Sequence, residues 1–241
     1  MLSSPRLAAC ALALSLLCPA GLAGPLPQAP LPAGSTLLEQ RFIADPTGQG
    51  GWLVQTLLSS GSSWRRLVVA LPGQGYRIGS PPAADRDYGD ASLRLHPIPG
   101  QPGAAWWLSS RALLHSGDAG RSWTPRMAGL PDPSDGRTAL RRLFPDPDHP
   151  SRLTLEISTE DGPQLYRSTD GGQRWEALGP PLGDRRGRIG LSQSEDGRQI
   201  EAVYRGERGD IHLLSRDGGQ SWQPRPATTR RKISEKSVQD L

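Results

Sequence analysis

Three copies of one pattern, Ser-x-Asp-x-Gly-x-x-Trp, recur at near-even intervals along this chain of 241 residues. The aspartates lie 52 and then 47 residues apart. A fixed period of this length is typical of stacked supersecondary units that share one core. The pattern residues are Ser116, Asp118, Gly120, Trp123, Ser168, Asp170, Gly172, Trp175, Ser215, Asp217, Gly219 and Trp222.

Each copy has the chemistry of a tight connection between two strands. The aspartate carboxylate can accept hydrogen bonds from nearby backbone N–H groups, and the glycine can adopt the positive φ that the reversal demands. An apolar pair precedes each copy, as Leu113 and Leu114 precede the first. A tryptophan buries about 150–250 Å² when it packs fully. We therefore expect the aspartate to set a hairpin turn and the tryptophan to pack against a neighbouring unit.

The pattern resembles the Asp-box, or BNR repeat, and the resemblance covers residues 90 to 225. The chain is similar to β-propeller proteins that carry this box, namely sialidases, the sortilin (Vps10) ectodomain, xyloglucanase-type glycoside hydrolases and photosystem assembly factors of the Ycf48 type. In those families the box joins the outer two strands of a blade, away from the ligand-binding face. The resemblance thus implies a structural role for the pattern residues and leaves the function open.

Short apolar runs separated by Gly, Pro, Asp and Ser predict an all-β chain with four strands in each period. A degenerate fourth copy is expected at Gly61-Ser-Ser-Trp64, with Ser59 in the place of the aspartate. We therefore predict a β-propeller-like repeat of about four four-stranded blades, in a small or partly open ring. The strands expected in the three clear units are 91–95, 104–109, 112–115 and 122–125; 139–144, 152–157, 164–167 and 174–178; and 188–192, 199–205, 210–214 and 221–224.

The two ends of the chain differ in composition from its middle. Residues 1–23 have the charge, short apolar run and small residues of a secretory signal peptide, which predicts an exported protein, periplasmic or secreted. Residues 24–34 are rich in Pro and are expected to form an extended, unpacked leader before the repeat domain, 35–224. Residues 225–241 form either a mobile basic tail or, through Lys232–Val238, a closing strand.

Composition argues against several classes of function. Both cysteines, Cys10 and Cys18, lie in the predicted signal peptide, so no disulfide, cysteine nucleophile or cysteine metal site is expected afterwards. The net charge of +4 is spread along the chain, unlike the continuous basic patch of a nucleic-acid binder. The four histidines lack the spacing of metal ligands. We expect no cofactor, no metal and no stable membrane span, and the oligomeric state is left open.

The resemblance to sialidases raises a catalytic hypothesis. That family uses an arginine triad, a tyrosine nucleophile assisted by a glutamate, and an aspartate. Arg77, in Tyr-Arg-Ile-Gly, and Tyr204, with Glu201 nearby, are the candidates, although the proline of the family motif is missing. Four units also fall short of the six blades of a sialidase.

The alternative to catalysis is binding. Trp106 and Trp107 point to opposite faces of their predicted strand. Either ring could stack on a ligand, or both could pack between blades. We predict a non-enzymatic binding or assembly platform for a protein or glycan ligand, with a sialidase-like or other glycoside hydrolase, intact or degenerate, as the alternative.

Overall fold

The computed structural model describes residues 29–47, 50–71, 73–83, 95–146, 149–182, 188–194, 198–206 and 209–225. These residues form four sheets of four antiparallel strands, as predicted. The first sheet contains β1 (Thr36–Ala44), β2 (Gly51–Ser59), β3 (Ser62–Leu71) and β4 (Gly75–Gly79). The second contains β5 (Leu95–Pro97), β6 (Ala105–Leu108), β7 (Leu113–Ser116) and β8 (Thr124–Pro125). The third contains β9 (Ala139–Pro145), β10 (Leu153–Thr159), β11 (Gly162–Ser168) and β12 (Glu176–Leu178). The fourth contains β13 (Arg188–Gln193), β14 (Ile200–Gly206), β15 (Gly209–Ser215) and β16 (Gln223–Pro224).

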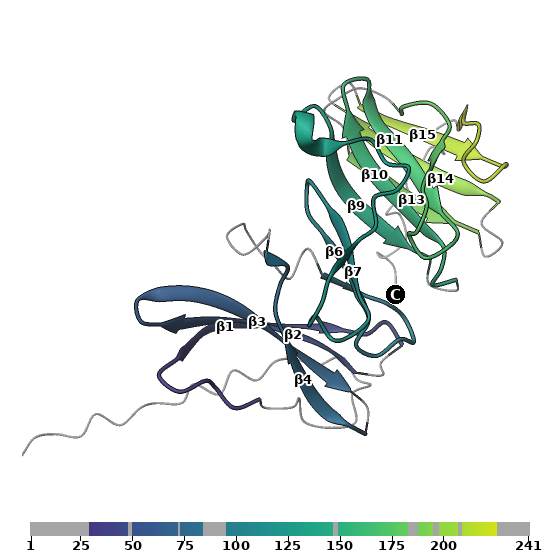
Figure 1. The fold of residues 1–241 in the computed structure, drawn as a ribbon. Coiled ribbons are helices and arrows are strands. Elements are labelled where there is room, and N and C mark those ends of the chain that lie inside the picture. The colour runs from purple at the N-terminus through teal and green to yellow at the C-terminus, as the bar shows by residue number, and fades with distance from the viewer. Residues whose placement is uncertain are drawn as a thin grey trace, which may run out of the picture.

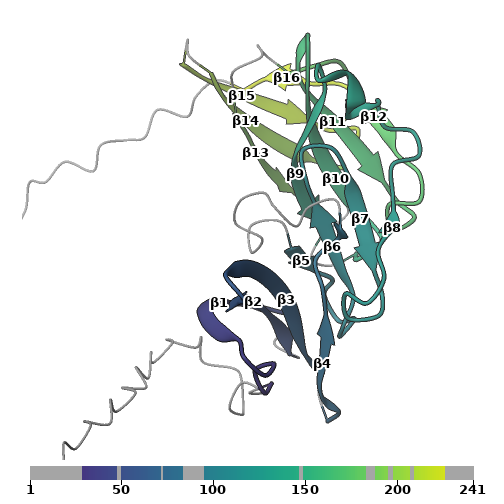
Figure 2. The same cartoon turned by 60° about the vertical axis from the view of Figure 1, so that its left-hand side comes forward.

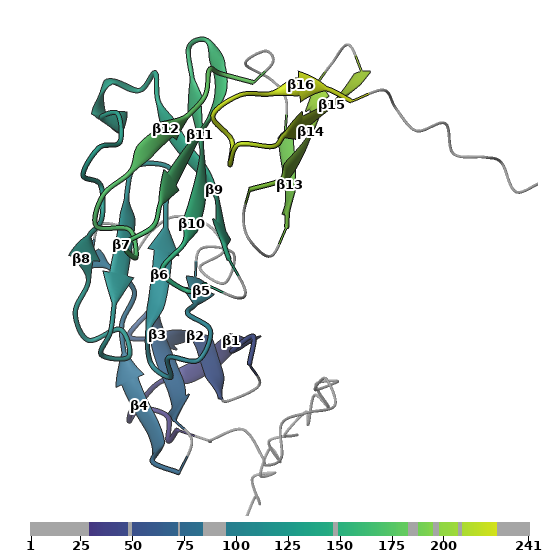
Figure 3. The same cartoon turned by 90° about the vertical axis from the view of Figure 1, so that its right-hand side faces the viewer.

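The four sheets follow one another as the blades of an open, propeller-like array (Figure 1). Within each sheet the strands pair in chain order, so every connection is between neighbours. The first strands, β1, β5, β9 and β13, lie along the inner side of the arc, and the fourth strands lie along its outer side (Figures 2 and 3). The first and fourth sheets stand at opposite ends, and the ring is not closed.

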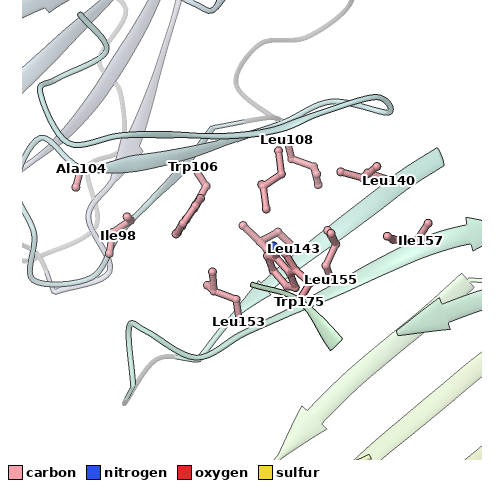
Figure 4. Close-up of a cluster of buried hydrophobic side chains, with 11 residues drawn as sticks. Ile98, Ala104, Trp106, Leu108, Leu140, Leu143, Leu153, Leu155, Ile157 and Trp175 are labelled. Atoms are coloured by element: carbon pink, nitrogen blue, oxygen red, sulfur yellow. The ribbon is translucent and has the colours of Figure 1, made fainter. Parts of the chain in front are cut away.

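Side chains from facing sheets form one apolar cluster at each joint. The cluster between the second and third sheets is the largest and contains two tryptophans, Trp106 and Trp175 (Figure 4). Trp106 comes from the centre of the second sheet, whereas Trp175 follows the turn of the third. Since successive strand residues point to opposite faces, the second and third sheets each contribute to the joint on either side of them.

The predicted fourth copy of the pattern at Ser59–Trp64 is wrong. This segment forms the hairpin between β2 and β3, in which Ser60 and Gly61 have φ values of 50° and 78°. The three true copies instead join the third strand of a sheet to the fourth. A two-residue hairpin also needs positive φ at its centre, so it selects a similar glycine-containing sequence. The prediction of a fourth sheet in this region was therefore correct, although the turn on which it was based is a different one.

The ends of the chain lie mostly outside the described residues. Neither the predicted signal peptide, 1–23, nor residues 226–241 of the predicted tail can be placed. The leader, 24–34, is described from Ala29, which is buried against Leu53 and Val68 of the first sheet. The expectation that the leader is unpacked is thus wrong at Ala29, because the first sheet stands at an end of the open array and has an apolar face that the chain can cover.

Candidate functional site

The three pattern loops close through the same hydrogen bonds. In the first loop the Ser116 hydroxyl donates to Asp118 Oδ1 at 2.9 Å and accepts the Gly120 N–H at 2.9 Å. Asp118 Oδ1 also accepts the Ser122 N–H at 2.9 Å. Gly120 has a φ of 76°, and its counterparts in the other loops are positive as well. The buried serine therefore links the aspartate to the glycine, so the turn is held together from within.

The carboxylates of these loops are held in the charged form. Burial acts to raise the pKa of Asp118, but hydrogen bonds from Ser122, Ser116 and the Arg121 amide outweigh it and lower this pKa to about 2. Hydrogen bonds from the Arg174 amide and the Ser168 hydroxyl lower the pKa of Asp170. A carboxylate that accepts several hydrogen bonds loses its basicity, so these aspartates are poor proton donors or acceptors at neutral pH.

The tryptophans of the loops connect each sheet to the one before it. Trp123 Nε1 donates to the Ser80 carbonyl at 2.9 Å, and Trp175 Nε1 donates to the Arg126 carbonyl at 3.0 Å. Each carbonyl belongs to the residue directly after the fourth strand of the preceding sheet. In the third loop Trp222 Nε1 is buried and has no hydrogen-bond partner among the residues that the structure describes. The loops thus act as joints between sheets, and the third joint is the exception.

The residues predicted for catalysis do not come together. Arg77 lies on β4 of the first sheet, exposed, whereas Tyr204 and Glu201 lie on β14 of the fourth, at the other end of the array (Figure 1). Tyr204 is buried against the third sheet. Glu201 is three positions away, on the opposite face of the strand, and is paired with Arg225. These residues therefore do not make an arginine pocket with a tyrosine–glutamate pair.

The two tryptophans proposed as ligand-binding residues are packing residues. Trp106 is 2% exposed in the joint to the third sheet, and Trp107 is 1% exposed in the joint to the first. The indole rings of Trp107 and Trp123 meet edge to face at 5.7 Å. With so little surface left, neither Trp106 nor Trp107 can stack on a sugar or a partner while the joints are intact. The second of the two readings, packing between blades, fits these positions.

Among the described residues, a groove of about 430 Å³ opens beside the joint between the second and third sheets. It is formed by the link from β8 to β9 together with the turn between β6 and β7. Apolar side chains dominate, and a guanidinium, a carboxylate and a hydroxyl complete the lining. The lining residues are Arg111, Met127, Leu130, Pro131, Asp132, Pro133 and Ser134. Apolar walls with a few polar groups are a common lining of ligand sites, so the groove is the candidate site.

Hydrogen bonds hold the groove in shape. Asp132 caps the short 3-10 turn Pro133–Asp135 by accepting the Ser134 N–H at 2.9 Å and the Ser134 hydroxyl at 2.8 Å. These bonds lower the pKa of Asp132. The backbone N–H of Trp175 donates to the Ala128 carbonyl at 2.9 Å, beside the indole bond to Arg126. The second pattern loop therefore anchors the segment that forms one wall of the groove.

The two charged side chains that line the groove, Asp132 and Arg111, differ in their hydrogen bonding. Both Asp132 oxygens are occupied by Ser134, whereas the exposed Arg111 side chain has no ion-pair or hydrogen-bond partner among the described residues. An incoming ligand would thus meet an apolar wall and a free cation. Neither groove nor cation was predicted from sequence, and the available signal was Pro131-Asp-Pro-Ser134, a capped turn in a link longer than a hairpin needs.

The described ranges contain neither a metal-binding cluster nor a membrane-spanning helix. No three His, Cys, Asp or Glu side chains there lie close enough to hold a metal ion. Over the same ranges no helix has the length and apolar character needed to cross a membrane.

The sequence matches no protein-family model and no curated protein. Similar solved structures include the GH74 xyloglucanase from Xanthomonas campestris, 16% identical over 77% of this chain, with a TM-score of 0.43. YCF48 from Cyanidioschyzon merolae is 15% identical over 82% of the chain, with a TM-score of 0.41. An ancestral GH74 enzyme is 16% identical over 83%, with a TM-score of 0.49. The chain spans 38%, 87% and 25% of these three structures. At such scores the likeness assigns neither an activity nor a partner.

Proposed function

We propose that the protein is an exported, non-enzymatic binding or assembly platform built on Asp-box propeller repeats. The observation that carries the proposal is the groove beside the joint of the second and third sheets, with its apolar wall and the free Arg111. The candidate catalytic residues lie on different sheets and on opposite faces, which favours binding over hydrolysis. A ligand that fits would combine an apolar group with an anionic one, as a protein segment or an acidic glycan does.

The pattern loops support this function indirectly. The aspartate, serine and glycine form the turn, and Trp175 anchors the wall of the groove through Arg126 and Ala128. A groove on hydrogen-bonded elements is preorganised, so less conformational entropy is lost when a ligand binds. The repeats therefore provide the scaffold, while the link between two blades provides the specificity.

The first experiment separates the platform from the alternative, a sialidase-like or other glycoside hydrolase. The protein and its Arg77→Ala variant are incubated with a fluorogenic sialoside and with a panel of other fluorogenic glycosides. We expect no turnover from either protein. Sialoside turnover that disappears in Arg77→Ala would establish the hydrolase and contradict the proposal.

The second experiment tests the groove. The protein is applied to arrays of immobilised peptides and glycans, and any retained probe is measured again with Arg111→Glu. Arg121→Glu is the matched control, because Arg121 is also exposed but lies on the first pattern loop outside the groove. We expect the charge reversal at Arg111 to weaken binding about tenfold or more and the control to leave it unchanged. Equal loss in both variants would remove the groove as the binding site.

A further inference from the structure

The outward faces of the two end sheets differ: the face of the first is apolar, with Leu53 and Val68 buried and Ile78 exposed, whereas the face of the fourth carries ion pairs. On the first sheet, the face turned away from the second carries a row across all four strands, Phe42, Leu53, Val68 and Ile78, which are register partners. We call this surface the end face. It also bears exposed Tyr76, beside Ile78 on β4. In a closed ring such an apolar face would pack against another blade, but here the ring is open.

The corresponding face of the fourth sheet carries two ion pairs beside the half-buried Val203 and Leu214. Glu201 pairs with Arg225, and Arg205 lies 3.9 Å from Asp210. A charged outer face is what a terminal repeat needs to remain soluble. A head-to-tail contact with a second copy of this chain would bury these ion pairs against the apolar end face at a cost in desolvation, so it is disfavoured.

A buried arginine lies beside the apolar row of the end face. Arg66 on β3 is 3% exposed, and no acidic side chain among the described residues pairs with it. Its Nε donates to Gln55 Oε1 at 2.8 Å. Its two terminal nitrogens, Nη1 and Nη2, donate to the carbonyls of Pro30 at 3.1 Å and Ala29 at 3.3 Å. Three neutral acceptors thus satisfy a cation that is out of contact with water.

The two carbonyls stand where the oxygens of a carboxylate would bind. A guanidinium presents Nη1 and Nη2 as a fork that matches both oxygens of one carboxylate, and such a charge-assisted pair is stronger than bonds to neutral groups. Ala29 meanwhile places its methyl group against Leu53 and Val68. Of residues 29–34, only Ala29 is buried, so this segment is attached by one small side chain and two carbonyls.

We propose that the end face of the first sheet is a docking site for an extended partner segment that carries an Asp or Glu side chain next to an apolar residue, and that Ala29 and Pro30 occupy this site in the free chain. The partner carboxylate takes the Arg66 fork, its apolar neighbour takes the place of Ala29, and Ile78 and Tyr76 extend the contact. The chain's own segment competes with the partner and holds its affinity down. This site is independent of the Arg111 groove.

The test uses the full chain and two capped peptides, acetyl-Leu-Asp-Ala-Leu-amide and its Asn counterpart, titrated by NMR with the Arg66 Nε–H signal as the local reporter. We expect the Asp peptide to bind at least about tenfold more tightly than the Asn peptide and to shift that signal. Equal affinities would overturn the proposal, because the carboxylate would then contribute nothing.

Two substitutions in the leader test whether it occupies the site. Ala29→Gln places a larger, polar but uncharged group where an apolar pocket receives a methyl, so the segment should detach. Ala33→Gln is the control, since Ala33 is exposed in the same segment. We expect Ala29→Gln to tighten binding of the Asp peptide about tenfold and the control to leave it unchanged. The same affinity in both variants would contradict competition by the leader.

Arg66→Gln and Arg66→Lys test the fork itself. We expect the preference for Asp over Asn to fall to within about twofold in Arg66→Gln and to return only in part in Arg66→Lys, which keeps the charge without the planar fork. A preference that persists in a folded Arg66→Gln protein would overturn the assignment. If that variant does not fold, the comparison of Ala29→Gln with Ala33→Gln still decides the proposal.

Discussion

The joint between the second and third sheets and the joint between the third and fourth use the same loop and achieve different results. At the former, Trp175 is 2% exposed and both its backbone N–H and its indole N–H are bonded. At the latter, Trp222 is only partly buried, and its buried indole N–H has no hydrogen-bond partner within the described part of the chain. Identical loop chemistry therefore does not guarantee an equally strong joint.

The difference arises in the sheet that receives the indole. The carbonyl of Gly179 directly follows β12, in the position that Arg126 has after β8. It accepts the side-chain amide of Gln164 at 2.6 Å instead of the indole N–H. A buried carboxylate, Glu156, also lies on the side of the third sheet that faces the fourth. Its cross-strand neighbour Leu165 belongs to the apolar cluster against which Trp222 packs. The comparison shows that a repeated loop supplies a donor and a ring, while the neighbouring sheet decides whether they are used.

The largest effect is expected when the tryptophan of either joint, Trp175 or Trp222, is replaced by alanine. We expect Trp175→Ala to lower the free energy of unfolding by about 3–5 kcal/mol, because it leaves a cavity in the larger cluster. Trp222→Ala should cost less, since its ring is only partly buried. Urea denaturation followed by circular dichroism measures both. Equal losses would break the comparison between the joints.

A more selective substitution removes only the indole N–H. Trp175→Phe loses the bond to Arg126 and leaves that carbonyl to be satisfied otherwise, so it should cost about 1 kcal/mol beyond the change in ring size. Trp222→Phe removes a buried donor that makes no hydrogen bond to a described residue, so no stability should be lost with that N–H group. The difference between the two variants in urea midpoint is the quantity to measure. A larger loss for Trp222→Phe would show that its indole has a partner.

Glu156 offers a test of the third joint alone. It is 3% exposed, and its Oε2 lies 3.3 Å from Arg142 Nε without a hydrogen bond. Burial raises the pKa of Glu156, and Arg142 offsets this only in part. Since the folded pKa exceeds the unfolded one, the stability that this group contributes below pH 4.5 is lost as the pH rises through the folded pKa.

The substitution Glu156→Gln should therefore raise stability at pH 7 by about 0.5 kcal/mol and flatten the pH profile above 4.5. Thermal unfolding at pH 4 and at pH 7 measures both effects. Glu160→Gln is the control, because Glu160 is an exposed carboxylate in the turn between β10 and β11 of the same sheet. A marked loss at pH 7 confined to Glu156→Gln would mean that the buried pair stabilises the joint.

The smallest expected effect is a loss of stability at low pH at the joint between the second and third sheets. His96 and His115 are the cross-strand neighbours of Trp106, and the ring of His115 lies 4.8 Å from that indole. Burial lowers the pKa of His96. Burial and Arg126 lower the pKa of His115, while Asp118 partly opposes them.

Because both folded pKa values lie below the unfolded value of 6.5, stability is complete above pH 6.5 and is lost as the pH falls through the folded values. His115→Gln should reduce this acid-dependent loss in a thermal unfolding series from pH 7.5 to 5. His212→Gln, on β15 outside the joint, should leave the loss in place. The opposite pattern would assign the acid sensitivity to the fourth sheet.

Much of the fold could be predicted from the sequence because its signals are local. The hairpin strands of the third and fourth sheets fall within about two residues of their predicted bounds, since turn residues mark them. The prediction of a pattern loop at Ser59–Trp64 was wrong because the β2–β3 hairpin and a pattern loop both need glycine at positive φ. The catalytic hypothesis depended on residues far apart in the chain, and nothing local reveals whether Arg77 and Tyr204 share a pocket.

What the sequence alone determined was the turn: a serine, an aspartate and a glycine within five residues satisfy one another's hydrogen bonds wherever the loop stands. Only the tertiary structure decided how the loops are used, since Trp175 reaches the carbonyl of Arg126, 49 residues earlier, and Trp222 finds no such partner. It likewise decided that Arg66 holds the carbonyls of Ala29 and Pro30 and that Met127 and Leu130 line a groove. Bonds within a turn depend on local geometry, whereas contacts between sheets depend on how each blade is placed against the next.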